Sequence, residues 1–538
     1  MFIGGVSRAR AATTALLVSL VCALAVWQQT PRAQSSDPIS YTVRIANPDK
    51  QYADVEAIVP TDGADSIDLM MPIWSPGYYR VEDYASKIEA FNARIPDGTA
   101  LVSEQPKQNR WRIQTRGARR IVLRYRVLCA QRSVTTNWID ADYAVLNGAP
   151  TFITLVEQRR RPHDVQIELP PAWTHAMTGL DDVRDGKPHH FRAADYETLV
   201  DSPIVAGKLA VHEFEVAGKK HFVVGAGDYA SWDGPAATRD LAAVVAEAYR
   251  FWGFLPYDKY LFLLMFRQGG GGLEHRNSNL STVRANISET TGRWSALGLL
   301  SHEYFHLFNV KRLRPIELGP FDFEKPPTTG SLWISEGVTS YYSNLMIVRA
   351  GLQTPDAYLD ALSALIGRLQ AAPGRLQQSV EQSSREVWGN SNSGVNPSAN
   401  TVSYYNKGEL LGLLLDAKIR RATNGRSSFD DVIRLAYQRY AGERGFTELE
   451  FRATAEETAG IDLSDWWRKS VSSTEELDYT DLLEWYGLRL TASSGPAGEW
   501  SLRRRDDATD AQAAHLRTWL ASSGRSGDRI LMPKHVAM

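Results

Sequence analysis

The sequence predicts an α+β protein in which a β-rich domain precedes mostly helical regions. Between residues 38 and 225, short β-branched or alternating runs are bounded by turn-rich pieces, and long helical patterns are missing. After this point apolar residues recur at helical spacing, and from residue 293 onward most segments have the pattern of helices. A chain of 538 residues has room for about two to four domains of ordinary size.

The β-rich region contains the clearest strand patterns of the chain. Strands are predicted over residues 39–45, 53–59, 121–128 and 165–169. Because each run is short and alternates or is β-branched, a sandwich-like N-terminal domain over residues 38–225 is the simplest interpretation.

The middle of the chain, residues 226–372, mixes both kinds of element. A helix is predicted over residues 236–252, and an apolar strand over residues 260–266 runs into the four glycines at 269–272. Further on, Ser428 with Asp431 and Thr447 with Glu450 have the spacing of capping boxes that open helices.

The segment after residue 372 is predicted to be an active-site loop followed by a helical domain, together spanning residues 373–488. Residues 373–403 are rich in Ser, Asn and Gln without a clear period, which predicts a long loop or lid. Residues 489–538 turn polar and charged and are predicted to be a short appendage.

Composition and the N-terminus bear on partners and location. Sixty-two acidic residues nearly balance 60 basic ones, and no basic stripe indicates nucleic-acid binding. Arg8 and Arg10 precede an apolar run at residues 11–26, which predicts a signal peptide over residues 1–33 and a periplasmic or secreted protein. An uncleaved anchor is the alternative, and no stable membrane span is expected after processing. Cleavage leaves Cys129 as the only cysteine, so no intramolecular disulfide is expected.

The sequence from Ser301 to His306 contains the pattern H-E-x-x-H. Residues four apart lie on one helix face, so His302 and His306 can bind the same ion at about 2.0–2.1 Å. Glu303 lies near that ion without needing to bind it, and there it can take a proton from the attacking water. A helix that merely packs two histidines is the alternative interpretation.

A catalytic metal site needs a third protein ligand. Residues 331–342 form a second apolar helical pattern that contains one carboxylate, Glu336. A carboxylate in such a setting needs a partner, and a zinc ion would provide one. Glu317 and Glu324, in a proline-rich loop, are the alternative ligands, and a helix N-terminal role is the alternative for Glu336.

H-E-x-x-H followed by W-x-x-E-G resembles the gluzincin pattern, and more narrowly the glycyl aminopeptidase family, relatives of aminopeptidase N. The run over residues 302–315, the run M-P-I-W-S-P-G-Y over residues 71–78 and the run V-H-E-F-E-V-A-G over residues 211–218 carry this resemblance. It covers most of the chain from about residue 40 to 490. The resemblance implies a β-rich N-terminal domain, a thermolysin-like catalytic domain, a helical C-terminal domain and a zinc cofactor.

Two further sites follow from the resemblance. Gly271, Gly272 and Glu274 match an exopeptidase motif whose glutamate binds the free α-amino group of the substrate, although His275 replaces its asparagine. Tyr405 matches the tyrosine of Y-x-K-G, which donates to the oxyanion, with Tyr404 as a rival.

The spacing also departs from that of aminopeptidase N, because 29 residues between His306 and Glu336 require an insertion. Many family members carry a PDZ domain near the C-terminus, for which the residues after 488 are too few.

The expected function is zinc-dependent hydrolysis of the N-terminal peptide bond of peptides, after small residues such as Gly or Ala. A zinc endopeptidase is the alternative among enzymes. A peptide-binding or scaffold protein with a degenerate site is the alternative of another class.

Overall fold

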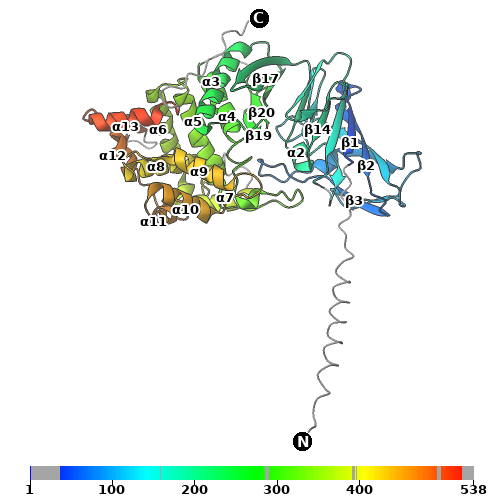
Figure 1. Ribbon diagram of the computed structural model, residues 1–538. Helices are drawn as coiled ribbons and strands as arrows, with labels where there is room; N and C mark the ends of the chain where they lie inside the picture. The colour runs from blue at the N-terminus through cyan, green and yellow to red at the C-terminus, as the bar shows by residue number, and fades with distance from the viewer. Residues whose placement is uncertain are drawn as a thin grey trace.

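The computed structural model describes residues 37–157, 159–284, 290–389, 397–493 and 499–523, together with Met1 and Gly394. Apart from Met1, the predicted signal peptide therefore lies outside the described residues. Within the described ranges, no helix is both long and apolar enough to cross a membrane. Figure 1 shows the N-terminal strands on one side of the molecule and the helices that follow them in the chain on the other.

The N-terminal domain is built from three sheets. Their orders are β13-β14-β11-β1-β2-β7-β4, β10-β3-β6-β5 and β12-β15-β9-β8. The elements are β1 (Ile39–Arg44), β2 (Tyr52–Pro60), β3 (Ser66–Met70), β4 (Ile88–Arg94), β5 (Ser103–Lys107), β6 (Arg110–Gln114), β7 (Arg120–Leu128), β8 (Trp138–Ile139), β9 (Tyr143–Leu146), β10 (Thr154–Leu155), β11 (His163–Glu168), β12 (His175–Thr178), β13 (Asp181–Asp182), β14 (His190–Ala193), α2 (Tyr196–Val200) and β15 (Ile204–Gly207). The four strands predicted in this region are present as β1, β2, β7 and β11.

Strand β7 shows why these sequences form a one-sided sheet. Its residues alternate between buried and partly or fully exposed along the strand, so one face packs into the domain core. On the other face Arg124 lies opposite Glu56 on β2, and Arg126 lies opposite Asp54. Both arginines make ion pairs with these partners, at 2.7 and 3.1 Å. Such exposed pairs contribute only about 0.2–1 kcal/mol each, so the buried face stabilises the sheet.

A five-stranded mixed sheet of order β16-β17-β18-β20-β19 forms the base of the second domain. Its strands are β16 (Ala210–Val216), β17 (Lys219–Gly227), β18 (Lys259–Phe266), β19 (Gly271–Glu274) and β20 (Ser278–Val283). The prediction that the N-terminal domain extends to residue 225 is therefore wrong in this detail, because β16 and β17 pair with the second sheet. The change of sheet falls between β15 and β16.

Strand β18 is buried on both faces. Tyr260, Phe262 and Leu264 point into the core shared with the helices. Leu261, Leu263 and Met265 belong to a separate cluster that contains Tyr143 and Val145 of β9 and Val205 of β15. The second sheet therefore packs between its own helices and the third sheet of the N-terminal domain.

Helices make up most of the remaining chain. They are α3 (Gly234–Trp252), α4 (Thr290–Phe305), η4 (Trp333–Val338), α5 (Thr339–Arg349), α6 (Pro355–Ala371), α7 (Val380–Arg385), α8 (Tyr404–Ala422), α9 (Phe429–Tyr440), α10 (Glu448–Ala459), α11 (Ser464–Ser470), α12 (Thr480–Tyr486) and α13 (Asp510–Leu520). Both predicted capping boxes are present, at the starts of α9 and α10. Helix α3 connects the parallel strands β17 and β18.

Two predictions about the C-terminal half are wrong in detail. The predicted loop over residues 373–403 contains α7 and two short 3-10 helices, Pro373–Leu376 and Val387–Gly389. These helices are too short to give a readable period.

The predicted appendage contains β21 (Leu488–Ala492), β22 (Trp500–Arg504) and α13. Trp519 of α13 is fully buried, and its Nε1 donates to the hydroxyl of Tyr341 on α5 at 2.9 Å. This segment is therefore part of the helical core.

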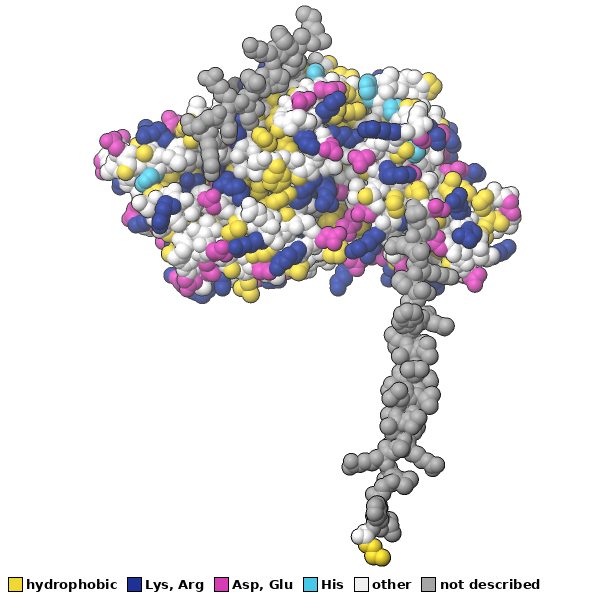
Figure 2. Space-filling view, in the orientation of Figure 1, with side chains coloured by type: hydrophobic (Ala, Val, Ile, Leu, Met, Phe, Trp, Pro, Cys, Tyr) yellow, Lys and Arg dark blue, Asp and Glu magenta, His cyan; other side chains and the backbone are white. Residues whose placement is uncertain are grey.

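The face of the molecule seen in Figure 2 has no large patch of purely positive or purely negative charge. Figure 2 shows basic and acidic side chains interspersed there, with small apolar areas between them. This mixture agrees with the net charge of −2 calculated from the sequence.

Candidate active site

Helix α4 positions the first part of the site. His302 and Glu303 lie in its last turn, and His306 follows immediately after Phe305, where the helix ends. The turn continues far enough for the His306 amide to donate to the His302 carbonyl at 3.2 Å. The two Nε2 atoms are thereby brought to 2.9 Å from each other.

Glu336 lies beside these histidines, on the π-helical turn η4 that leads into α5. Its Oε2 is 3.1 Å from His306 Nε2 and 3.5 Å from His302 Nε2. Ligands at about 2.0–2.1 Å from a tetrahedral ion are separated by about 3.3–3.5 Å. Two imidazole nitrogens and one carboxylate oxygen, with spacings of 2.9 to 3.5 Å, therefore fit the donor set of a zinc ion.

The other nitrogens of the two imidazoles are also engaged. His306 Nδ1 lies 2.8 Å from the carbonyl oxygen of Asn309, and His302 Nδ1 lies 3.3 Å from Ser340 Oγ. Such outer contacts fix the tautomer and the orientation of metal-binding imidazoles. Both Nε2 atoms are left facing Glu336.

Glu303 is buried beside this cluster without joining it. Burial raises the pKa of Glu303 to about 8, against the opposing effect of His306. A cation bound nearby would lower that pKa again, which would place the carboxyl to exchange protons near neutral pH. Gly272 on β19 approaches so closely that a Cβ there would collide with the Glu303 carboxyl.

Strand β19 carries Gly271, Gly272 and Glu274 at the edge of the five-stranded sheet as it is described. Glu274 is 3% exposed, and one oxygen of its carboxylate lies within 4.8 Å of ligand atoms of Glu303 and His306. Its Oε1 has no hydrogen-bond partner in the described part of the chain. The carboxylate is thus held beside the cluster with one oxygen free of hydrogen bonds.

Lys311 forms an ion pair with Glu274. Its Nζ is 3.6 Å from Glu274 Oε1 and 2.8 Å from Asp201 Oδ1. Asp201 also accepts from the Arg276 amide and lies 3.2 Å from His275 Nδ1. Although burial acts in the opposite direction, the Lys311 ammonium holds the pKa of Asp201 well below its usual range. His275, which departs from the family motif, therefore faces Asp201.

Replacement of Lys311 is expected to destabilise the protein, because Lys311→Met leaves Asp201 and Glu274 without their shared cation. Removal of one partner from a buried ion pair costs about 3–5 kcal/mol. Lys208→Met is the matched control, since Lys208 pairs with Asp142 on the surface. Its effect is expected to stay within about 1 kcal/mol. Urea unfolding of both variants measures the difference, and equal midpoints would show that Lys311 is not a structural counter-ion.

Tyr404 and Tyr405 open helix α8, after the N-cap residue Ser403. The Tyr405 ring centroid is 6.0 Å from that of His302, and the ring is only partly buried. Tyr404 is 2% exposed, and its ring packs between those of Tyr79 and Tyr405. Of the two tyrosines, Tyr405 therefore faces the histidines, and Tyr404 has the contacts of a packed residue.

Two glycines allow α8 to approach η4. A Cβ on Gly337 would collide with the backbone of Gly408, and a Cβ on Gly408 would meet the backbone of Trp333 and Gly337. The two helices therefore touch through their backbones. This contact fixes the position of Tyr405 relative to Glu336.

The alternative metal ligands lie in other surroundings. Glu324 accepts hydrogen bonds from Asn109 and Arg110 of the N-terminal domain, at 2.9 and 2.7 Å. Glu317 is exposed and accepts from Thr329 Oγ1 at 3.2 Å. Neither glutamate belongs to a cluster of potential metal ligands within the described residues.

Sequence reasoning missed three residues that the structure brings to this site, namely Tyr79, Asp201 and Lys311. Tyr79 belongs to the N-terminal domain, and its hydroxyl donates to Glu336 Oε1 at 2.8 Å. It directly follows the M-P-I-W-S-P-G-Y run, which was the only available signal for it. Lys311 lies in the run after H-E-x-x-H, but nothing in its sequence context indicates burial.

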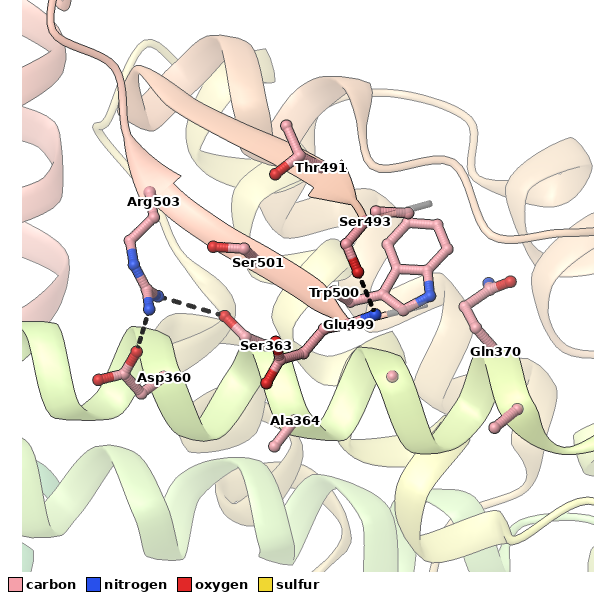
Figure 3. Close-up of a pocket in the computed structure, with 13 residues that line it drawn as sticks. Asp360, Ser363, Ala364, Gln370, Thr491, Ser493, Glu499, Trp500, Ser501 and Arg503 are labelled. Carbon is pink, nitrogen blue, oxygen red and sulfur yellow. Dashed lines mark hydrogen bonds and ion pairs between the residues drawn. The ribbon is translucent and has the colours of Figure 1, made fainter. Parts of the chain in front are cut away.

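A separate cavity lies away from these residues. It has a volume of about 810 Å³ and lies between α6 and the hairpin of β21 and β22, as Figure 3 shows. Asp360 and Arg503 form an ion pair across one end, and Trp500 lines the other. None of the predicted site residues lines it, so the cavity is not part of the catalytic cluster.

Two imidazoles and a carboxylate converge beside a buried glutamate, and the helix that carries the H-E-x-x-H motif packs against a mixed sheet. This arrangement defines a metallopeptidase. Comparison with known proteins specifies the family. A model of the peptidase M61 N-terminal domain matches residues 40–208, and a model of the M61 glycyl aminopeptidase matches residues 295–411. The chain belongs to the M61 glycyl aminopeptidase family.

Solved structures share the fold of this chain. An aminopeptidase N family protein from Idiomarina loihiensis is 27% identical, with a TM-score of 0.80 over 88% of this chain and 82% of that one. A mutant M1 zinc metallopeptidase from Deinococcus radiodurans, bound to a Tyr-Ser-Ala substrate, is 14% identical. Its TM-score is 0.51 over 82% of this chain and 94% of that one, a likeness of fold. No curated protein matches the sequence.

Proposed function

We propose that the protein is a zinc aminopeptidase that removes a small N-terminal residue, such as Gly or Ala, from peptides. The observation that carries the proposal is the convergence of His302, His306 and Glu336 within 2.9 to 3.5 Å of one another, with Glu303 and Glu274 beside them. Membership of the M61 family and the likeness to an aminopeptidase N family protein support it.

In this proposal His302, His306 and Glu336 hold a zinc ion. When bound, such an ion acts as a Lewis acid that polarises the scissile carbonyl and makes water more acidic. Glu303 takes the proton of the attacking water and returns it to the leaving amine. Although the Tyr405 ring is partly exposed, desolvation of the phenol and the nearby Glu336 carboxylate raise its pKa well above the usual value, so the group stays protonated and can donate to the oxyanion.

Substrate binding is assigned to β19. Because β19 ends its sheet as described, Gly271 and Gly272 can offer backbone groups to an extended peptide. Glu274 is the last residue of β19, and its Oε1, which lies 3.6 Å from Lys311 Nζ, has no hydrogen-bond partner in the described part of the chain. Three carboxylates, those of Glu274, Glu336 and Asp201, lie around the site beside the ammonium of Lys311. This excess of negative charge favours a cation, both the metal and the ammonium of an unblocked N-terminus.

The experiment that tests this proposal compares one peptide with a free and an N-acetylated N-terminus. The free peptide is expected to be cleaved well and the acetylated one poorly, since an acetylated N-terminus offers no ammonium to the Glu274 carboxylate. Glu274→Ala is expected to lower kcat/KM for the free peptide by roughly 10–100-fold, which corresponds to a charge-assisted hydrogen bond of about 1.5–3 kcal/mol. A panel of unblocked dipeptides defines the preferred first residue.

Glu213→Ala is the control variant, because Glu213 lies exposed on β16. This variant is expected to cleave the free and the acetylated peptide at the wild-type rates. Equal turnover of free and acetylated peptides by the wild type would defeat the aminopeptidase proposal and favour an endopeptidase. Absence of turnover with zinc bound would favour a peptide-binding protein.

A further inference from the structure

A segment of the N-terminal domain reaches the metal-binding cluster. Trp74 is buried, and its Nε1 donates to the Asp322 carbonyl at 2.9 Å. Ser75 Oγ is 2.8 Å from the hydroxyl of Tyr84. The chain then turns, with the Tyr78 amide donating to the Ser75 carbonyl at 3.0 Å. These contacts fix the base of a turn from which Tyr79 extends.

The same turn passes directly over the substrate end of the site. Gly77 has a φ of +89°, and a Cβ at this position would collide with the carboxylate of Glu274. A residue with a side chain would therefore meet both backbone strain and a steric clash. The glycine lets the N-terminal domain lie close enough for the next residues to reach the catalytic domain.

Tyr79 uses that approach to contact Glu336. Its hydroxyl donates to Oε1 at 2.8 Å, while Oε2 of the same carboxylate faces His306 at 3.1 Å and His302 at 3.5 Å. The two oxygens thus have separate surroundings. One is engaged by the N-terminal domain, and the other completes the triangle of potential ligand atoms.

The Tyr79 ring is held independently of this hydrogen bond. It packs edge-on against Trp388, at 6.1 Å between centroids, and against Tyr404, at 6.4 Å. Removal of the hydroxyl alone therefore leaves the ring its packing partners. This separation makes the hydrogen bond testable without disturbance of the fold.

We propose that Tyr79 is a positioning residue for the metal centre: its hydrogen bond to Oε1 holds Glu336 so that Oε2, beside the two histidines, would be the oxygen offered to an ion. The N-terminal domain thereby supplies part of the metal affinity. The inference rests on the proposed function, because it takes Glu336 as a zinc ligand. Outer partners of this kind typically change metal affinity by about 10–100-fold.

The test measures zinc affinity of the full chain by competition with a chromophoric chelator. Tyr79→Phe is expected to weaken zinc binding by about 10–100-fold. Tyr78→Phe is the matched control, because the Tyr78 ring packs against the cluster between the two domains instead. It is expected to bind zinc as the wild type does. In the cobalt-substituted protein, Tyr79→Phe is also expected to change the intensity of the visible bands, which reports the coordination number.

Urea unfolding of the metal-free proteins separates positioning from packing. The metal-free Tyr79→Phe protein is expected to unfold at the wild-type midpoint, because the ring contacts remain. Wild-type zinc affinity and an unchanged cobalt spectrum in Tyr79→Phe would overturn the inference. A wild-type protein that binds no zinc would instead defeat the proposed function, so the two failures are distinguishable.

Discussion

Glu303→Gln is expected to keep its zinc and to lose peptidase activity by about 10²–10⁴-fold or more. The carboxamide has nearly the same shape as the carboxylate but cannot take a proton from water. Glu303 is buried against Gly272 and outside the triangle formed by His302, His306 and Glu336, so its replacement leaves the ligand atoms in place. Measurement of kcat/KM together with zinc content per chain checks both parts of the prediction.

Glu317→Gln is the matched control, since it makes the same chemical change at an exposed position. It is expected to show wild-type activity and zinc content. If Glu303→Gln turned over peptides at a rate close to that of the wild type, another group would have to be the general base. Loss of zinc from Glu303→Gln would show instead that this residue helps to hold the metal.

Glu336→Ala is expected to abolish turnover and to weaken zinc binding strongly. Loss of an outer partner of a metal ligand typically weakens metal binding by about 10–100-fold, and loss of the ligand itself is expected to weaken it more. The substitution removes one of three protein donors and leaves two imidazoles without their carboxylate. Glu317→Ala and Glu324→Ala are expected to bind zinc normally, because the former is exposed and the latter pairs with Arg110. Chelator competition on the three variants checks the ligand assignment.

A loss of zinc in Glu324→Ala or Glu317→Ala, with retention in Glu336→Ala, would move the third ligand into the loop. Circular dichroism of each metal-free variant shows whether the fold is retained. A variant that unfolds is replaced by the matching glutamine substitution, which preserves volume.

Local spacing explains how much of the site was predictable. His302, Glu303 and His306 fall within five residues, so the helix alone brings them together. Glu336 was recognisable as a lone carboxylate in an apolar helix. Tyr79 and Asp201 come from distant parts of the chain, and only tertiary packing brings them to the cluster. Their sequence surroundings carry no periodic signal for this contact.

The fold was likewise predictable where the sequence has a periodic pattern and not where it lacks one. Strands such as β7 alternate strongly and were predicted, whereas α7 has six residues, too few to show a helical period. The C-terminal segment was misjudged because its polar residues dominate its composition. Trp519, the residue that anchors it, is one large buried side chain that donates a hydrogen bond to Tyr341 of α5.

The burial of β18 on both faces joins the N-terminal domain to the rest of the molecule. Because this strand has no free face, separation of the N-terminal domain from the rest would expose Leu261, Leu263 and Met265 to water. An exposed apolar patch of this kind promotes aggregation. The two parts are therefore expected to unfold as one cooperative unit, and the catalytic half is not expected to fold when it is transplanted alone.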